Sequence, residues 1–174
     1  MWLNLKTLVR ASLEGASRVA VLGVGSELRG DDQAGLLVAE RLRKRCKMNG
    51  SCPQIELFHG ATAPENLTGE IKSYRPSHLI LVDAADVGKE PGTVEVISPE
   101  LISGTSFSTH MMPLKIIVDY MRDSINCKVM VIGIQPKTLE YAGPVSREIR
   151  ASVRQVATAI EAVVREIPDS QVEQ

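Results

Sequence analysis

Three runs of apolar residues stand out along the chain, and none of them alternates with polar residues. They are rich in Val, Ile and Leu and cover Arg18–Gly25, His78–Asp83 and Lys128–Ile134. Runs of this kind are typical of strands that are buried on both faces of a mainly parallel sheet. Two further segments, Gln54–Phe58 and Thr93–Ile97, alternate more and are predicted to be strands nearer the edges.

Between these runs, apolar residues recur every three or four positions, which is the spacing of one face of a helix. The predicted helices cover Asp32–Lys47, Ala63–Tyr74, Pro113–Met121 and Ser146–Ile167. A proline at or near the start of two of them suits a first helical turn. The same spacing of leucines and valines before Arg18 predicts an additional amphipathic helix within residues 1–17.

Strands that alternate with helices predict a three-layer α/β fold, with a twisted, mostly parallel sheet between helices. The link between Asp83 and Thr93 is too short for a crossover helix, so the strand at Thr93–Ile97 is expected to run antiparallel to its neighbour. The 174 residues suffice for one domain with a sizeable core. We therefore expect a single domain over residues 1–174, with residues 168–174 as a frayed tail.

The composition narrows the classes of partner. A net charge of −1 and only 3% aromatic residues argue against binding to nucleic acid. No apolar run approaches the roughly 20 residues that span a bilayer. The three cysteines are odd in number and widely spaced, which predicts no disulfide and a reducing cytoplasm. We expect a cytoplasmic monomer that does not insert into a membrane.

The segment "VLGVGSELRGDDQAG" has the outline of a phosphate-binding loop but the wrong side chains. Leu28 occupies the position of the third glycine in a dinucleotide fingerprint. Asp31 and Asp32 stand where a Walker loop needs a lysine and a hydroxyl, and two carboxylates would repel a phosphate. One of them is expected to cap the following helix. The second, at the carboxyl end of a strand, suits a cation.

Two more residues extend this hypothesis to a metal site. Asp83 closes a buried apolar run, where an unpaired carboxylate is costly unless it is hydrogen-bonded or bound to a metal. His110 lies in a polar turn just before a predicted helix. A parallel sheet brings such positions to one edge, and two carboxylates with one imidazole suit nickel or zinc. Turn-forming or capping roles for the same residues remain open.

At this point the chain resembles the hydrogenase maturation endopeptidases, and most of all the branch that serves the hydrogenase of the formate-hydrogenlyase complex. The matching segments, in the family's order, are "GVGSELRGDDQAG", "TAPEN", "LILVDAAD", "STHMMPL" and "GIQP". The resemblance implies removal of the C-terminal extension from the large-subunit precursor of a nickel–iron hydrogenase. It also implies that Asp32, Asp83 and His110 bind nickel carried by that precursor, or another divalent cation such as zinc in its place.

The resemblance leaves the chemistry of cleavage open. Nickel serves either as a recognition handle or as a Lewis acid as well, and in the second case Asp31 or Asp32 is the predicted general base. Gly25 and Ser26 are the predicted substrate contacts, although Ser26 stands where the family commonly has asparagine. The alternative function is a chaperone that checks the nickel of the loaded precursor without cutting it, since it would need the same three ligands.

Overall fold

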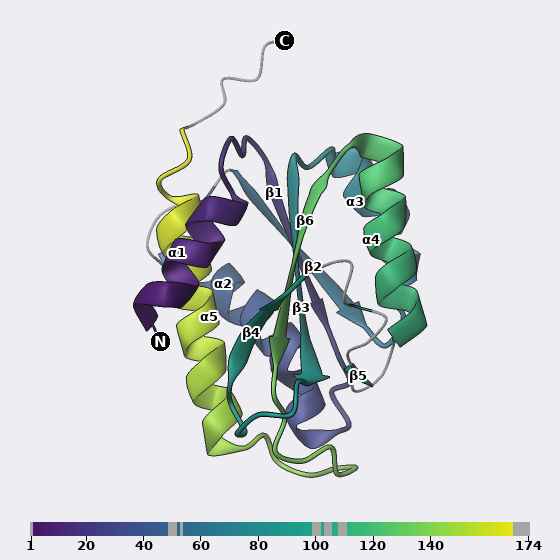
Figure 1. Ribbon diagram of the computed structural model, residues 1–174, viewed down its shortest axis with the longest axis vertical. Helices are drawn as coiled ribbons and strands as arrows, with labels where there is room; N and C mark the ends of the chain where they lie inside the picture. The colour runs from purple at the N-terminus through teal and green to yellow at the C-terminus, as the bar shows by residue number, and fades with distance from the viewer. Residues whose placement is uncertain are drawn as a thin grey trace.

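The computed structural model describes residues 2–48, 52, 54–98, 102, 106–107 and 111–168. It contains a mostly parallel sheet between two layers of helices (Figure 1), which confirms the predicted fold class. Its main strands follow the spatial order β2-β1-β3-β6-β4. The strands are β1 (Val19–Val24), β2 (Ile55–Ala61), β3 (His78–Asp86), β4 (Val94–Ile97), the short β5 (Ser106–Phe107) and β6 (Lys128–Ile134).

Helices cover both faces of this sheet. Those of one layer are α1 (Trp2–Ser12), α2 (Ala34–Met48) and α5 (Arg147–Val164), and those of the other are α3 (Thr68–Tyr74) and α4 (Met111–Ile125) (Figure 1). Two 3-10 turns, η1 (Gly30–Gln33) and η2 (Pro64–Leu67), precede α2 and α3. The predicted helices that begin at Asp32 and Ala63 thus each begin with a tighter turn.

The central strands are buried on both faces, as the unbroken apolar runs predict. Val19 and Val21 of β1 belong to the core with α1, α2 and α5, whereas Ala20 and Leu22 belong to the core with α3 and α4. Successive side chains of a strand point to opposite faces, so a strand between two helical layers must be apolar at every position.

The two strands predicted near the edges, β2 and β4, are the outermost strands on the main path of the sheet. β2 pairs with β1 in parallel, and β4 pairs antiparallel with β6, with Val94 opposite Ile134. The antiparallel direction of the strand at Thr93–Ile97 is therefore confirmed. Its partner in the sheet is β6, which lies between β3 and β4.

The N-terminal helix packs against the C-terminal one. Leu5, Val9 and Leu13 are buried in the core that α5 also lines. On the rim of this contact the Arg10 guanidinium donates to the Glu166 carboxylate at 2.7 Å. Residues 169–174 lie outside the described part of the chain, so the frayed tail stays a prediction.

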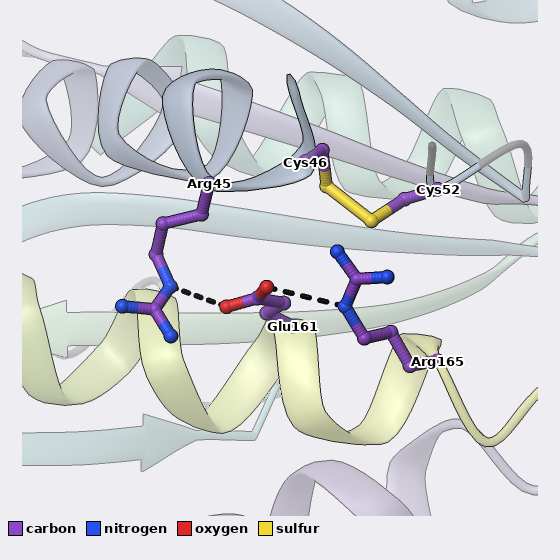
Figure 2. The surroundings of a disulfide bond; sticks show 5 residues. All are labelled: Arg45, Cys46, Cys52, Glu161 and Arg165. Atoms are coloured by element: carbon purple, nitrogen blue, oxygen red, sulfur yellow. Dashed lines mark hydrogen bonds and ion pairs between the residues drawn. A yellow bond between two sulfur atoms is a disulfide. The ribbon is translucent and has the colours of Figure 1, made fainter. Parts of the chain in front are cut away.

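The cysteine prediction is wrong, because Cys46 and Cys52 form a disulfide with their Cα atoms 5.5 Å apart. Figure 2 shows it at the end of α2, close to Glu161 of α5. The Glu161 carboxylate is buried and accepts from the guanidinium groups of Arg45 and Arg165. Spacing along the chain gave no sign of the pair, because the cysteines meet only where the chain turns back from α2 towards β2.

One glycine fixes how closely α2 approaches the sheet. A Cβ atom on Gly35, in the first turn of α2, would collide with the carbonyl oxygens of Val24 and Val82. The helix therefore begins in backbone contact with both β1 and β3.

Among the described residues, no helix combines the length and the apolar character needed to span a bilayer.

We predict that Gly35→Ala lowers the free energy of unfolding by about 3 kcal/mol or more, because backbone atoms of two strands would have to move. Urea denaturation of the purified variant measures this. The matched control is Gly69→Ala in α3, where a Cβ meets nothing within 4 Å. There alanine should stabilise by roughly 0.5–1 kcal/mol. Equal effects at the two positions would contradict the close approach.

Candidate active site

The candidate site lies at the point where the strand order reverses. From β1 the chain passes through α2 to β2 on one side, and β3 then lies on the other side of β1. In open α/β sheets, ligands bind in the crevice at the carboxyl ends of the two strands that flank such a point. η1 follows β1 directly. Val82 pairs with Gly23, so Asp83 is level with Val24, the last residue of β1.

β3 extends three residues beyond Asp83, further than the sequence predicts. Ala85 and Asp86 pair with β5, which prolongs the strand. Asp83 therefore lies inside a strand, opposite Gly133 of β6, instead of at a strand end. This placement explains its complete burial.

The carboxylate of Asp31 joins two loops that are far apart in the sequence. Its Oδ2 accepts the backbone N–H groups of Lys137 and Thr138 at 2.8 and 3.2 Å, and its Oδ1 accepts that of Ser146 at 2.6 Å. The Asp31 N–H donates in turn to the Thr138 carbonyl at 3.1 Å. Both oxygens of this buried side chain thus hold the loop between β6 and α5, which favours Asp32 over Asp31 as the general base.

Asp31 does not cap η1, whose N-cap position is Arg29, and both of its oxygens accept from the loop between β6 and α5. The Asp31 Oδ1 accepts from Ser146, the N-cap residue of α5, whose hydroxyl accepts from the Ile149 N–H at 3.3 Å. The carboxylate therefore supports the start of a different helix. Only the tertiary structure brings that helix to this place. A capping role for Asp32 stays a prediction.

Gly25 and Ser26 shape the turn that carries the aspartates. Gly25 has φ of +141°, and a Cβ there would collide with the carbonyl oxygen of Asp32. Ser26 is buried, and its hydroxyl oxygen accepts from the Leu28 N–H at 3.3 Å. Both residues thus position η1. Their contact with a substrate stays a prediction.

Asp32 and Asp83 are both completely buried and lie close enough to interact electrostatically. The Asp83 Oδ1 accepts the N–H of Ala84 at 2.8 Å, whereas its Oδ2 has no hydrogen-bond partner among the described residues. Burial, and then the charge of Asp32, raise the pKa of Asp83 well above its usual range. Such a pair must hold a proton or lie beside a cation.

The donor set therefore fits a divalent cation as far as the structure describes it. Two carboxylates from separate elements converge, and one buried oxygen has its lone pairs available. The predicted third ligand, His110, lies outside the described residues. Within the described part of the chain, no group of three or more His, Cys, Asp or Glu side chains forms a complete metal site.

Gln135, in the segment "GIQP", has a role that sequence analysis did not assign. This buried amide accepts the N–H groups of Val87 and Lys89 at 2.8 and 3.3 Å, and donates to the Asp86 carboxylate at 3.2 Å. It holds the loop after β3 against the end of β6. The signal was available, because Gln135 closes an apolar run just as Asp83 does.

A cysteine nucleophile finds no support in the described structure. Cys46 and Cys52 are paired in the disulfide, and Cys127 is buried. Burial raises the pKa of the Cys127 thiol to about 12, so it is not a thiolate at neutral pH. Among the described residues, the carboxylates of Asp32 and Asp83 are therefore the candidates for the reactive groups of this edge.

We predict that Asp31→Asn lowers the free energy of unfolding by roughly 2 kcal/mol, because an amide must turn a donor towards at least one of three backbone N–H groups. Thermal and urea denaturation measure the loss. Asp119→Asn in α4 is the control, because among the described residues that carboxylate pairs with Lys115 alone, in a largely exposed ion pair. It should change stability by less than about 0.5 kcal/mol. A loss no larger than that of the control would contradict the role of Asp31.

The raised pKa of Asp83 predicts a pH dependence of stability in the metal-free protein. Between the unfolded pKa of about 4 and the raised folded pKa, the folded state binds more protons. Stability should therefore fall as the pH rises through that window, by up to about 1.4 kcal/mol per pH unit. Asp83→Asn should remove this part of the slope and be the more stable protein at pH 7. Urea denaturation in EDTA at pH 5, 6 and 7 tests this, and identical slopes would refute it.

Comparisons with known proteins identify the family of the chain. The family model described as hydrogenase maturation protease matches residues 36–166. The chain is 34% identical over 142 residues to the Hydrogenase 3 maturation protease of Escherichia coli (strain K12), a match that covers 81% of this chain and 87% of that protein.

Two solved structures share the fold. The crystal structure of a NiFe hydrogenase maturation protease, HycI, from Thermococcus kodakarensis KOD1 has a TM-score of 0.81 at 28% identity, and the match covers 91% of this chain and 99% of that one. The solution structure of the endopeptidase HycI from Escherichia coli has a TM-score of 0.69 at 31% identity, with coverages of 83% and 90%. The chain described here therefore belongs to the hydrogenase maturation protease family.

Proposed function

We propose that this hydrolase removes the C-terminal extension of the large-subunit precursor of a nickel–iron hydrogenase, and that nickel already bound to the precursor directs the cut. The observation that carries the proposal is the buried pair Asp32 and Asp83 in a chain of this protease family. A carboxylate oxygen with no hydrogen-bond partner among the described residues, beside a second carboxylate, favours a dication as ligand.

In this proposal the precursor supplies the nickel, and the protease supplies three ligands. Asp32 and Asp83 take up the ion with His110, and zinc or another divalent cation can occupy the site in its place. Asp83 must lose its proton to bind the cation. The affinity of the site for the cation should therefore rise with pH until the pH passes the raised pKa of Asp83. Docking is thus coupled to the ionisation of a buried acid.

Two roles for the metal remain compatible with these residues. As a handle, it fixes the precursor against the sheet edge. As a Lewis acid as well, it would polarise the scissile carbonyl. In either case Asp32 is the carboxylate that we propose as the general base, accepting the proton of the attacking water, because both oxygens of Asp31 are engaged by backbone N–H groups.

A chaperone that checks the nickel without cutting is the alternative, since the same ligands would serve it. The match to a family of proteases favours the enzyme. A monomeric, cytoplasmic protein remains our expectation. The cysteines no longer support a cytoplasmic location, because Cys46 and Cys52 form a disulfide and disulfides are rare in reducing compartments.

The test is incubation with a candidate large-subunit precursor, nickel-loaded and nickel-free, read by intact mass. We expect loss of a C-terminal fragment from the loaded form alone. His110→Ala and Asp32→Ala should each abolish it, because each removes a metal ligand, and His110→Ala should do so without unfolding the protein.

Asp123→Ala, at an exposed position of α4, is the matched control and should cleave at the rate of the unaltered enzyme. A stable complex with the loaded precursor and no mass loss would instead support the chaperone. Full activity of His110→Ala would remove that residue from the site.

A further inference from the structure

A groove of about 420 Å³ lies between α2 and α5, on one face of the sheet. Its lining includes four cationic side chains and one acidic one. The cations are Arg41 and Lys44 of α2 and Arg150 and Arg154 of α5, and the acid is Glu40. The groove is therefore positively charged, although the whole chain carries a net charge of −1.

Much of this charge is not neutralised within the groove. Glu40 forms an ion pair with Lys44 at 2.6 Å, which accounts for one cation. The Nε of the half-buried Arg41 is shielded from solvent and has no hydrogen-bond partner among the described residues. Arg150 donates to the backbone carbonyl of Val145 at 3.1 Å, a bond that leaves its charge intact. Guanidinium groups whose charge is not neutralised, such as the half-buried Arg41 and the exposed Arg150, favour a carboxylate partner.

One end of the groove lies at residues adjacent in sequence to the candidate site, on the α2 and α5 side of the sheet. Gln33, which lines it, directly follows Asp32 in the sequence, and Val145, on the opposite wall, directly precedes the residue whose N–H donates to Asp31. From there it follows the first turns of both helices, which begin at the same edge of the sheet. Its wall from Gln33 to Lys44 spans about 16 Å of helix, enough for roughly five residues of extended peptide.

Asp83 alternates with Val82 and Ala84, which face the α2 and α5 side of the sheet, so its own side chain points to the α3 and α4 side. We propose that this groove binds an acidic segment of the protein substrate at a distance from the bond to be cut. The inference rests on the proposed function, because it takes the hydrogenase precursor as the peptide. Charge complementarity identifies the occupant, because an extended stretch with several Asp or Glu residues can pair with the arginines of the groove. The groove thus contributes to the affinity for substrate, whereas cleavage takes place at the carboxylates of the sheet edge.

The test reverses charge at the two exposed arginines of α5, in the variant R150E/R154E. Its control is K72E/K128E, which changes the net charge equally at two exposed lysines that do not line the groove. Binding of intact precursor is measured in the Asp32→Ala background, and cleavage is measured without that substitution. Far-ultraviolet circular dichroism checks that both variants fold.

We expect R150E/R154E to weaken precursor binding and raise KM by about tenfold at low salt, with kcat unchanged and the difference shrinking at 0.5 M salt. The control should remain within about twofold of the unaltered protein. As a milder second variant, R150Q/R154Q should show a smaller loss in the same direction.

Equal affinity in the groove and control variants would overturn the proposal while leaving cleavage, and with it the proposed function, intact. Conversely, loss of binding in R150E/R154E alone would uphold the groove even if the unaltered protein binds the precursor and cuts nothing. A precursor that the unaltered protein neither binds nor cuts would contradict both. Competition by single-stranded RNA as efficient as that by the precursor would assign the groove to polyanions in general and overturn the acidic-peptide proposal.

Discussion

The carboxylate of Asp31 holds together the parts of the molecule that matter for function. Its three backbone hydrogen bonds tie the turn after β1 to the loop between β6 and α5. One side of that connection carries Asp32 at the sheet edge, and the other leads into α5 and its arginines. Because the bonds are buried and charge-assisted, they are among the stronger interactions available to a loop. The site and the basic groove therefore share one anchor.

The burial of Asp32 and Asp83 requires that the charge of at least one of these carboxylates be neutralised. Two carboxylates that are both withdrawn from water cannot both be ionised at low cost. A proton on Asp83, whose pKa is raised by burial, would meet the requirement, and so would a dication beside the pair. The backbone contacts of Gly25 and Gly35 keep the aspartates in this strained environment, because no side chain separates the turn, α2 and the strands. Packing thus maintains what electrostatics disfavours, which is common at functional sites.

Sequence alone determined the architecture, because its causes are local or periodic. Unbroken apolar runs required strands covered on both faces, and the short link after β3 required an antiparallel strand. The order of the segments around Asp32, Asp83 and His110 was sufficient to indicate the family. The pattern of strands also placed two of the predicted ligands at one edge, since the carboxyl ends of parallel strands meet there. The architecture needed only the alternation and spacing of residues along the chain, whereas the family followed from the resemblance of five ordered segments.

Only the tertiary structure assigned different roles to the adjacent residues Asp31 and Asp32. The sequence left the general base open between Asp31 and Asp32, and only the contacts of Lys137, Thr138 and Ser146 with Asp31 separate an anchor from a candidate base. The same holds for the Cys46–Cys52 disulfide and the amide of Gln135, whose partners come from other segments. The basic groove likewise needs α2 and α5 side by side. Each of these features depends on contacts between segments distant in the chain or on a reversal of its direction, and the pattern of a single segment does not encode them.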